Sequence, residues 1–229
     1  MENYVVKRLI WYGVLTLVGI LLLLLIGGAV IYHLATRVPV FYPTGEADPK
    51  IQAALNDRFL QKASALTGDL QREGRWDLRL TEDEVNAWLS VDLPKNHPDL
   101  LPSHFQEPRI RIGREELTVA CRTEWAGRSA VLWVRVRAQL TRPDVLEIRL
   151  RKAGIGLLPL STASLLHRLE EGLQRAGVDV RREERDGEPA LTISLAASDP
   201  ESRRRVHVDA VDLTDGHVFI SGTTEEHGR

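Results

Sequence analysis

The chain has 229 residues, a formal net charge of −2 and one cysteine, Cys121. This length accommodates a membrane anchor and one domain that buries a core without disulfide cross-links. The near-zero net charge gives no general attraction to nucleic acid, and a single cysteine excludes an intrachain disulfide and any cysteine pair for metal or redox chemistry.

The first predicted element is a helix that spans a membrane. No side chain between Leu9 and Tyr32 is charged, and about 20 apolar residues suffice to cross the core of a bilayer. A cleaved signal peptide is the alternative, but its apolar region is shorter and ends at small residues. Bulky residues stand at 31–34 instead. We therefore predict a retained transmembrane anchor over 9–33.

The charges beside this helix predict its orientation. Lys7 and Arg8 precede the helix, and Arg37 alone follows it. Because positively charged flanks stay in the cytoplasm, we expect residues 1–8 there and the C-terminal part on the exported, periplasmic or extracytoplasmic, side. Aromatic residues are typical of both membrane interfaces, and those predicted there are Tyr4, Trp11, Tyr12, Tyr32, Phe41 and Tyr42.

A linker and a folded domain are predicted after the anchor. Residues 34–48 are interpreted as the linker, because their latter part contains two prolines and a Thr-Gly step. The exported domain occupies 49–224, and 225–229 form a short tail. Asp48-Pro49 is typical of a helix N-terminus, and apolar residues then recur at helical spacing, which predicts a helix over 49–70.

Two further helices carry clear boundary signals. Thr81-Glu82-Asp83-Glu84 is a capping box, and it predicts a short helix with Trp88 and Leu89 on its buried face. Ser161 or Thr162 caps a third helix over about 163–176 that stops at Gly177. The apolar stripe of this third helix consists of Leu165, Leu166, Leu169 and Leu173.

The remaining segments are predicted to be strands. Apolar residues match across three two-residue turns, at Ala126-Gly127, Asp186-Gly187 and Asp215-Gly216, which indicates antiparallel hairpins. Before the last hairpin the apolar positions change parity, and this predicts a β-bulge near 209–210. The predicted fold class is α+β: an N-terminal transmembrane helix, then one exported domain with a long curved antiparallel sheet packed on helices.

One apolar segment, 154–160, suits neither a strand nor a helix, because two glycines and a proline interrupt it. In one interpretation it lines the mouth of an apolar groove or touches the bilayer. In the other it is a buried connector that covers the core. Its candidate ligand-binding residues are Ile155, Leu157, Leu158 and Leu160.

Four arginines are predicted at outward positions of two adjacent strands. The expected register sets Arg137 opposite Arg149 and Arg135 opposite Arg151. Because opposed like charges destabilise a sheet and arginine suits phosphate recognition, this stripe is a candidate surface for an anionic partner. The alternative is that Glu116 and Glu147 neutralise it.

No pattern of catalytic or metal-binding residues is present. The histidines lack metal-ligand spacing, and His207 and His217 are assigned to the solvated surface of the last hairpin. Ser129 and Ser161 lack the context of a nucleophile. The sequence therefore predicts no enzyme, no catalytic residue, no metal and no cofactor.

Four segments together resemble one half of a tubular lipid-binding domain: 80–89, 106–151, 156–173 and 206–222. In that superfamily a strongly twisted sheet wraps a helix and leaves an apolar groove for acyl chains. Similar segments occur in small one-helix envelope proteins of bacteria. The resemblance implies an apolar ligand, and transport or sensing rather than chemistry.

We therefore expect a single-pass membrane protein of the cell envelope whose exported domain binds a lipid or another apolar ligand without catalysis. The alternative is a structural module that scaffolds an envelope protein assembly, with a protein partner on the arginine stripe. Neither hypothesis involves nucleic acid.

Overall fold

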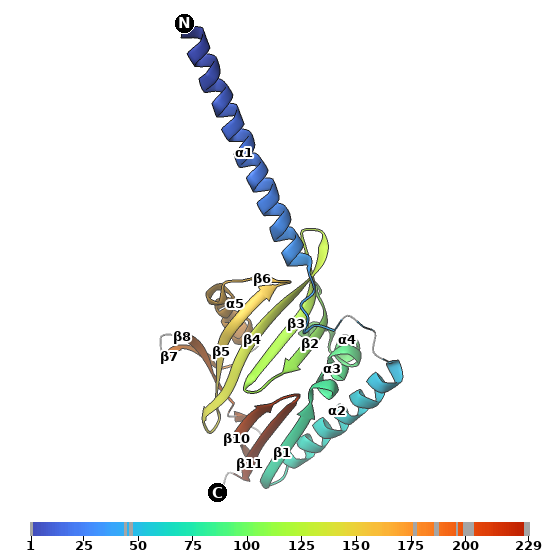
Figure 1. The fold of residues 1–229 in the computed structure, drawn as a ribbon. Coiled ribbons are helices and arrows are strands. Elements are labelled where there is room, and N and C mark those ends of the chain that lie inside the picture. The colour runs from blue at the N-terminus through green and yellow to red at the C-terminus, as the bar shows by residue number, and fades with distance from the viewer. Residues whose placement is uncertain are drawn as a thin grey trace.

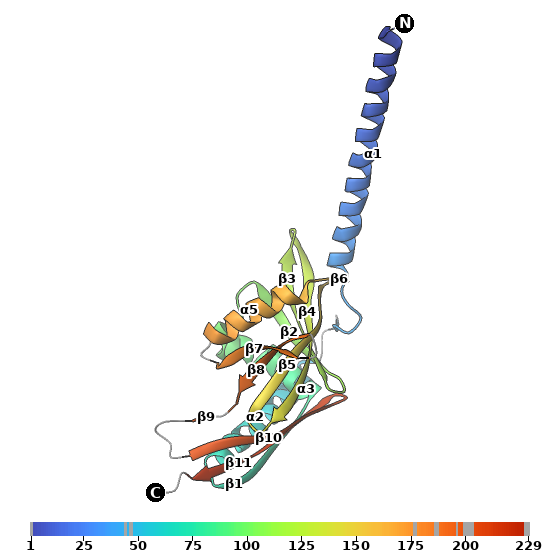
Figure 2. The same cartoon turned by 90° about the vertical axis from the view of Figure 1, so that its left-hand side faces the viewer.

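In a computed structural model of the chain, one long helix leads into an α+β domain with two antiparallel sheets (Figures 1 and 2). The structure describes residues 2–43, 45, 48–175, 178–185, 188–195, 197–198 and 204–226. The fold class predicted from the sequence, α+β with an N-terminal apolar helix and a large antiparallel sheet, is confirmed at this level.

The N-terminal helix, α1, spans Glu2–Thr36. Its part from Gly19 to Thr36 has a mean hydropathy of 2.1 and is long and apolar enough to cross a membrane. Both views show it pointing away from the domain (Figures 1 and 2). Leu21 to Leu25 are each more than half exposed, so a continuous apolar surface is left without protein contacts.

The larger sheet has the strand order β2-β3-β4-β5-β8-β7, with β6 paired to the end of β5. Its strands are β2 (Phe105–Ile112), β3 (Glu116–Trp125), β4 (Arg128–Arg142), β5 (Val145–Ile155), β6 (Leu158–Pro159), β7 (Val180–Arg185) and β8 (Glu188–Ser194).

The register of this sheet follows the matching of apolar positions. Val119 lies opposite Val134, as predicted from the turn at Ala126-Gly127. Val180 lies opposite Ile193, as predicted for the next hairpin, although its Asp186-Gly187 turn lies outside the described residues. Apolar side chains therefore share one face of the sheet across every predicted pair of strands.

One register prediction is wrong. Arg137 lies opposite Arg149 as expected, but Arg135 lies opposite Lys152 and not opposite Arg151. The cause is a shift of register between Arg135 and Val136, which leaves Arg151 as an extra residue on β5. Such a bulge restores the match of apolar residues farther along both strands.

The smaller sheet has the order β1-β11-β10-β9. Its strands are β1 (Gly74–Thr81), β9 (Ala197–Ser198), β10 (Arg204–Thr214) and β11 (His217–Glu226). Thr214 lies opposite His217 across the predicted two-residue turn, and a register shift between Val208 and Ala210 confirms the predicted bulge.

The prediction of one long sheet is wrong, because the last hairpin belongs to the smaller sheet and does not continue the larger one. Strand β1 instead pairs with β11 over its full length, and the two sheets meet through loop contacts. The Gly216 N–H donates to the Ile112 carbonyl at 2.8 Å, and the Glu115 N–H donates to the Leu213 carbonyl at 3.2 Å. Isolated bonds of this kind join the sheets without a continuous ladder.

The helices of the domain are α2 (Pro49–Leu70), α3 (Glu82–Val91), α4 (Leu93–Asn96), the 3-10 turn η1 (Pro98–Leu100) and α5 (Thr162–Arg175). Two of the three predicted helix N-termini are confirmed by their caps. The Asp48 carboxylate accepts from the Lys50 N–H at 2.8 Å. In the capping box, the Glu84 N–H donates to Thr81 Oγ1 at 3.1 Å, and the Thr81 N–H donates to Glu84 Oε2 at 2.9 Å.

The main core cluster lies beneath α5. Leu166 is 1% exposed and packs with Val180, Leu191 and Ile193. Leu173 and the half-buried apolar residues of β5 surround this cluster. Of its predicted leucine stripe, the helix contributes Leu166 and Leu173 to a core shared with β5, β7 and β8, whereas Leu169 is 37% exposed.

Candidate functional site

The end of α1 is joined to the larger sheet by close packing. Ala35 is fully buried and contacts Ala130 and Ile155. The Leu157 N–H donates to the Leu34 carbonyl at 2.9 Å, which is a carbonyl that the C-terminus of a helix leaves without a helical partner. The segment interpreted as a linker over 34–48 thus begins inside α1 and touches the domain at once.

Gly156 allows this close approach. Its φ angle is +56°, and a Cβ atom built there would lie 2.2 Å from the Ala35 carbonyl oxygen. The Gly156 carbonyl accepts from Trp133 Nε1 at 2.8 Å. Only glycine combines this backbone angle with the absence of a side chain, so the junction depends on glycine at this position.

The residues after α1 continue the packing on the opposite face of the sheet. Tyr42 is 3% exposed and packs with Ala120 and Val131. Its hydroxyl donates to the Glu107 carbonyl at 2.7 Å, and burial raises the pKa of this phenol. The placement of Tyr42 at a membrane interface is therefore wrong: it is a core residue of the domain.

The four candidate residues of the apolar segment divide into two pairs. Ile155 is 8% exposed and Leu158 is half-buried, and both pack in the junction with Ala35. Leu157 and Leu160 are 46% and 38% exposed. The segment is thus a connector on its inner side and an exposed apolar surface on its outer side.

The tip of the β3–β4 hairpin lies beside the last turns of α1 (Figures 1 and 2). The rings of Tyr32 and Trp125 have centroids 6.2 Å apart. The Arg128 guanidinium carbon lies 5.6 Å from the centroid of the Tyr32 ring, within the range of a cation–π contact. Sequence reasoning missed this cluster, although Trp125 and Arg128 flank the predicted turn and could have been noticed there.

The sheet face that carries the core under α5 continues across β4 and β3 as an apolar surface. Five paired or neighbouring side chains form it, four of them half-buried and one, Val119, exposed: Leu117, Val119, Cys121, Leu132 and Val134. Val119 is 42% exposed. We call these five residues the open apolar face. A contiguous apolar surface that is partly exposed is a candidate site for an apolar partner.

Cys121 belongs to this face and is not a reactive thiol. Burial raises the pKa of the Cys121 thiol to about 11. Because the thiolate is the nucleophilic form, the side chain acts as a small apolar group at neutral pH.

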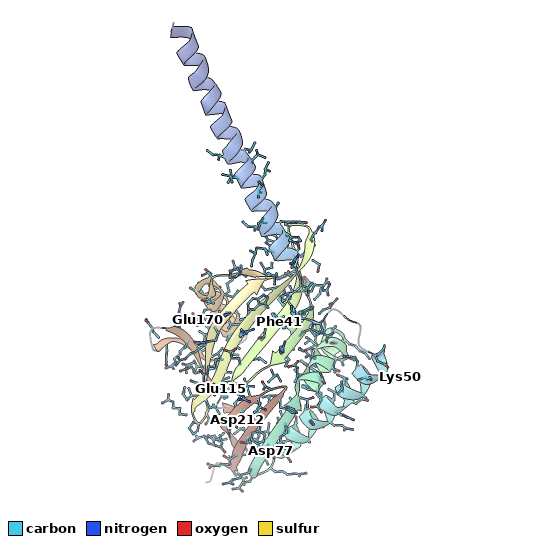
Figure 3. All side chains as sticks on the ribbon, viewed as in Figure 1. Phe41, Lys50, Asp77, Glu115, Glu170 and Asp212 are labelled. Carbon is cyan, nitrogen blue, oxygen red and sulfur yellow. The ribbon has the colours of Figure 1, made fainter. Side chains whose placement is uncertain are left out.

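The predicted arginine stripe lies on the other face of the sheet and is paired with carboxylates. Arg135 lies 3.8 Å from Glu116, and Arg137 forms an ion pair with Glu115, which is labelled in Figure 3. The stripe therefore combines both signs of charge along β3 and β4.

The rest of the stripe lies on β5. Arg149 pairs at 2.6 Å with Glu147, whose side chain is 1% exposed. Arg151 lies exposed at the bulge and has interactions of its own.

The two sheets are linked by a polar contact at the bulge of β10. His207 Nδ1 lies 2.6 Å from Asp144 Oδ2, and the Val208 N–H donates to Asp144 Oδ1 at 2.6 Å. The His207 side chain is 27% exposed, so it is held between the sheets and the expectation of a solvated side chain is wrong. Among the residues that the structure describes, no three His, Cys, Asp or Glu side chains gather as metal ligands would.

Three features thus stand out: an apolar helix without protein cover, a tight junction at its end, and the open apolar face beside α5. The resemblance to a tubular lipid-binding domain stays a prediction. The chain matches no protein-family model, no curated protein and no solved structure.

Proposed function

We propose that the chain is a membrane-anchored, non-catalytic envelope protein whose exported domain binds a lipid or another apolar molecule. In this proposal α1 spans the bilayer, residues 1–8 lie in the cytoplasm, and the domain with its curved sheets and helices lies on the exported side. The observation that carries the proposal is the open apolar face on the same side of the sheet as α5.

The geometry of that face supports binding. Leu166 of α5 closes the core over β7 and β8, while Val119 on β3 remains 42% exposed. Full burial of an exposed side chain of this kind stabilises by about 1.5–3 kcal/mol, and Val119 can gain the part that corresponds to its exposed fraction. An acyl chain that lies along β3 and β4 would cover the five residues of the open apolar face and remove their apolar side chains from water.

The anchor supports the same function. Helix α1 exposes Leu21 to Leu25 to its surroundings, which is favourable within the acyl chains of a membrane. The short connection between α1 and the sheet keeps the open apolar face beside a bilayer, where lipids are abundant. A low intrinsic affinity is then sufficient for occupancy, because the local ligand concentration is high.

Photocrosslinking with the full chain in vesicles tests the proposal. The probe is phosphatidylcholine with a diazirine in its acyl chain, and the crosslinked peptides are mapped by mass spectrometry. We expect crosslinks on the part of β3 and β4 that carries the open apolar face, 117–121 and 132–134, in addition to α1. The variant Val119→Asp should lose most of the β3 and β4 crosslinks and keep those on α1.

Leu100→Asp is the matched control, because Leu100 is 69% exposed outside the open apolar face and its replacement should leave the crosslinks unchanged. Crosslinks confined to α1 in the unsubstituted chain would overturn the binding function. If a protein and not the lipid probe is found crosslinked to β3 and β4, the scaffold alternative is favoured.

A further inference from the structure

We propose that two loops of the domain, the β3–β4 hairpin tip (125–128) and the β5–β6 turn (156–157), enter the lipid headgroup layer and hold the domain against the membrane. The inference rests on the proposed role of α1 as a membrane anchor and adds a second, peripheral contact with the same bilayer. The partner is a surface that contains anionic phospholipid.

The level of the two loops along α1 is set by contacts with its last turns. Tyr32 ends the charge-free stretch that begins at Leu9, and 24 helical residues extend about 36 Å, enough for a bilayer core of about 30 Å. Trp125 and Arg128 contact the Tyr32 ring. The hairpin tip therefore lies at the depth where the apolar part of the helix ends.

The β5–β6 turn lies at nearly the same depth. Its Leu157 N–H bonds to the carbonyl of Leu34, two residues beyond Tyr32 and thus about 3 Å farther along the axis. The Leu157 side chain is 46% exposed and Val38, just after α1, is 41% exposed. Apolar side chains are thus exposed around the point where the helix leaves the bilayer.

The chemistry of the cluster matches a membrane interface. Tryptophan and tyrosine are enriched at the level of the headgroups, and arginine binds phosphate through a planar fork of donors. Arg37 and Arg128 are both exposed at this end of the domain. A basic residue close to an anionic lipid surface is attracted to it electrostatically.

Close packing at the junction holds the two loops beside the end of α1. A Cβ atom on Gly156 would lie 2.2 Å from the Ala35 carbonyl oxygen, and one on Gly154 would lie 2.6 Å from the Leu158 carbonyl oxygen. This close backbone approach at Ala35 keeps both loops near the end of α1 and so favours their contact with the interface. The smaller sheet and the C-terminus lie at the opposite end of the domain (Figures 1 and 2).

Spin-label depth measurements on the full chain test the inference. In a Cys121→Ala background, single labels are attached to Ser129→Cys at the hairpin, Leu157→Cys at the turn, Leu23→Cys in α1 and Asp77→Cys on β1. Asp77 is exposed and lies far from α1 (Figure 3). The protein is reconstituted into vesicles of phosphatidylcholine with phosphatidylglycerol, and collisions with oxygen and with a water-soluble nickel chelate are compared.

We expect labels at 129 and 157 to report a depth between that of Leu23→Cys and that of Asp77→Cys. If both read as fully aqueous while Leu23→Cys reads as bilayer interior, the inference is overturned and the anchor stands. If Leu23→Cys itself reads as aqueous, the proposed anchoring function fails.

A charge variant tests whether Arg128 contributes to the headgroup contact. Arg128→Gln should shift the label at 129 outward and remove the difference between vesicles with and without phosphatidylglycerol. Arg114→Gln is the control, because Arg114 is 83% exposed and pairs with Asp215 at the tip of the last hairpin. Equal depths in all vesicles with Arg128 intact would overturn the role of anionic lipid.

Discussion

The two ends of the domain are held together by different forces. The end near α1 is joined by apolar packing and close backbone approach, with Ala35 fully buried and Gly156 at a positive φ angle. The far end is joined by charged groups, with Asp144 between the sheets and Glu84 beneath α2. The contacts of Gly156 should therefore respond to added volume, and those of Asp144 and Glu84 to lost charge.

The largest effect is expected from Gly156→Ala. The new methyl group would overlap the Ala35 carbonyl and force an unfavourable φ angle, so we expect a loss of about 3 kcal/mol in the free energy of unfolding. Guanidinium unfolding of the full chain in detergent, followed by tryptophan fluorescence, measures it. Gly172→Ala on α5 is the control, because a Cβ there meets nothing within 4 Å. Equal stability of the two variants would show that the junction is loose.

A smaller effect is expected from Asp144→Gly. Glycine keeps the φ angle of +62° and removes the bonds to His207 and to the Val208 N–H. Loss of a charged acceptor from a half-buried donor should cost about 2 kcal/mol in the same unfolding measurement.

Asp144→Asn sharpens this test. Asparagine tolerates the backbone angle and keeps an acceptor for Val208, so it should lose less stability than glycine. An asparagine variant that unfolds as easily as the glycine variant would contradict the role of the Val208 bond.

The smallest effect is a dependence on pH at Glu84. Burial alone would raise the pKa of this carboxyl, but the hydrogen bonds from Lys62 and from the Thr81 N–H outweigh it and lower the pKa below its ordinary 4.5. Because the folded-state pKa is the lower one, the contribution of Glu84 to stability is present at neutral pH and is lost as pH falls below 4.5 through the folded-state value.

Glu84→Gln isolates this charge. Glutamine preserves the capping box and removes the ionisation, so the variant should lose less stability than the unsubstituted chain between neutral and acidic pH, by less than about 1 kcal/mol. Unfolding midpoints on both sides of pH 4.5 measure the difference. If both proteins lose the same stability at acidic pH, that loss arises from carboxylates other than Glu84.

Local patterns in the sequence predict most of the elements and their pairing. The Val119–Val134 register, the bulge before Ala210 and the capping box at Thr81 each arise from residues close in sequence, so periodicity and turn chemistry reveal them. The partner of β11 was not predictable in this way. Strand β1 lies more than 130 residues earlier in the chain, and no local signal distinguishes it from β2 as a neighbour.

The junction was missed for a related reason. An alanine near the end of an apolar helix looks like any helical residue, and the burial of Ala35 depends on a glycine about 120 residues later in the chain. The apolar composition of 154–160 was visible in the sequence, but composition does not show that Ile155 would pack inward while Leu157 faces outward.

The outer edge of β2 has a consequence for how the domain behaves among its own copies. Side chains occupy the hydrogen-bonding groups of this edge strand: the Asn86 amide bonds both the N–H and the carbonyl of Ile110, and Glu82 accepts from the Ile112 N–H. Pro108 offers no N–H at all. An unprotected edge would recruit a strand from another molecule. With its donors and acceptors occupied by side chains, the β2 edge of the larger sheet is closed to a strand from a second copy.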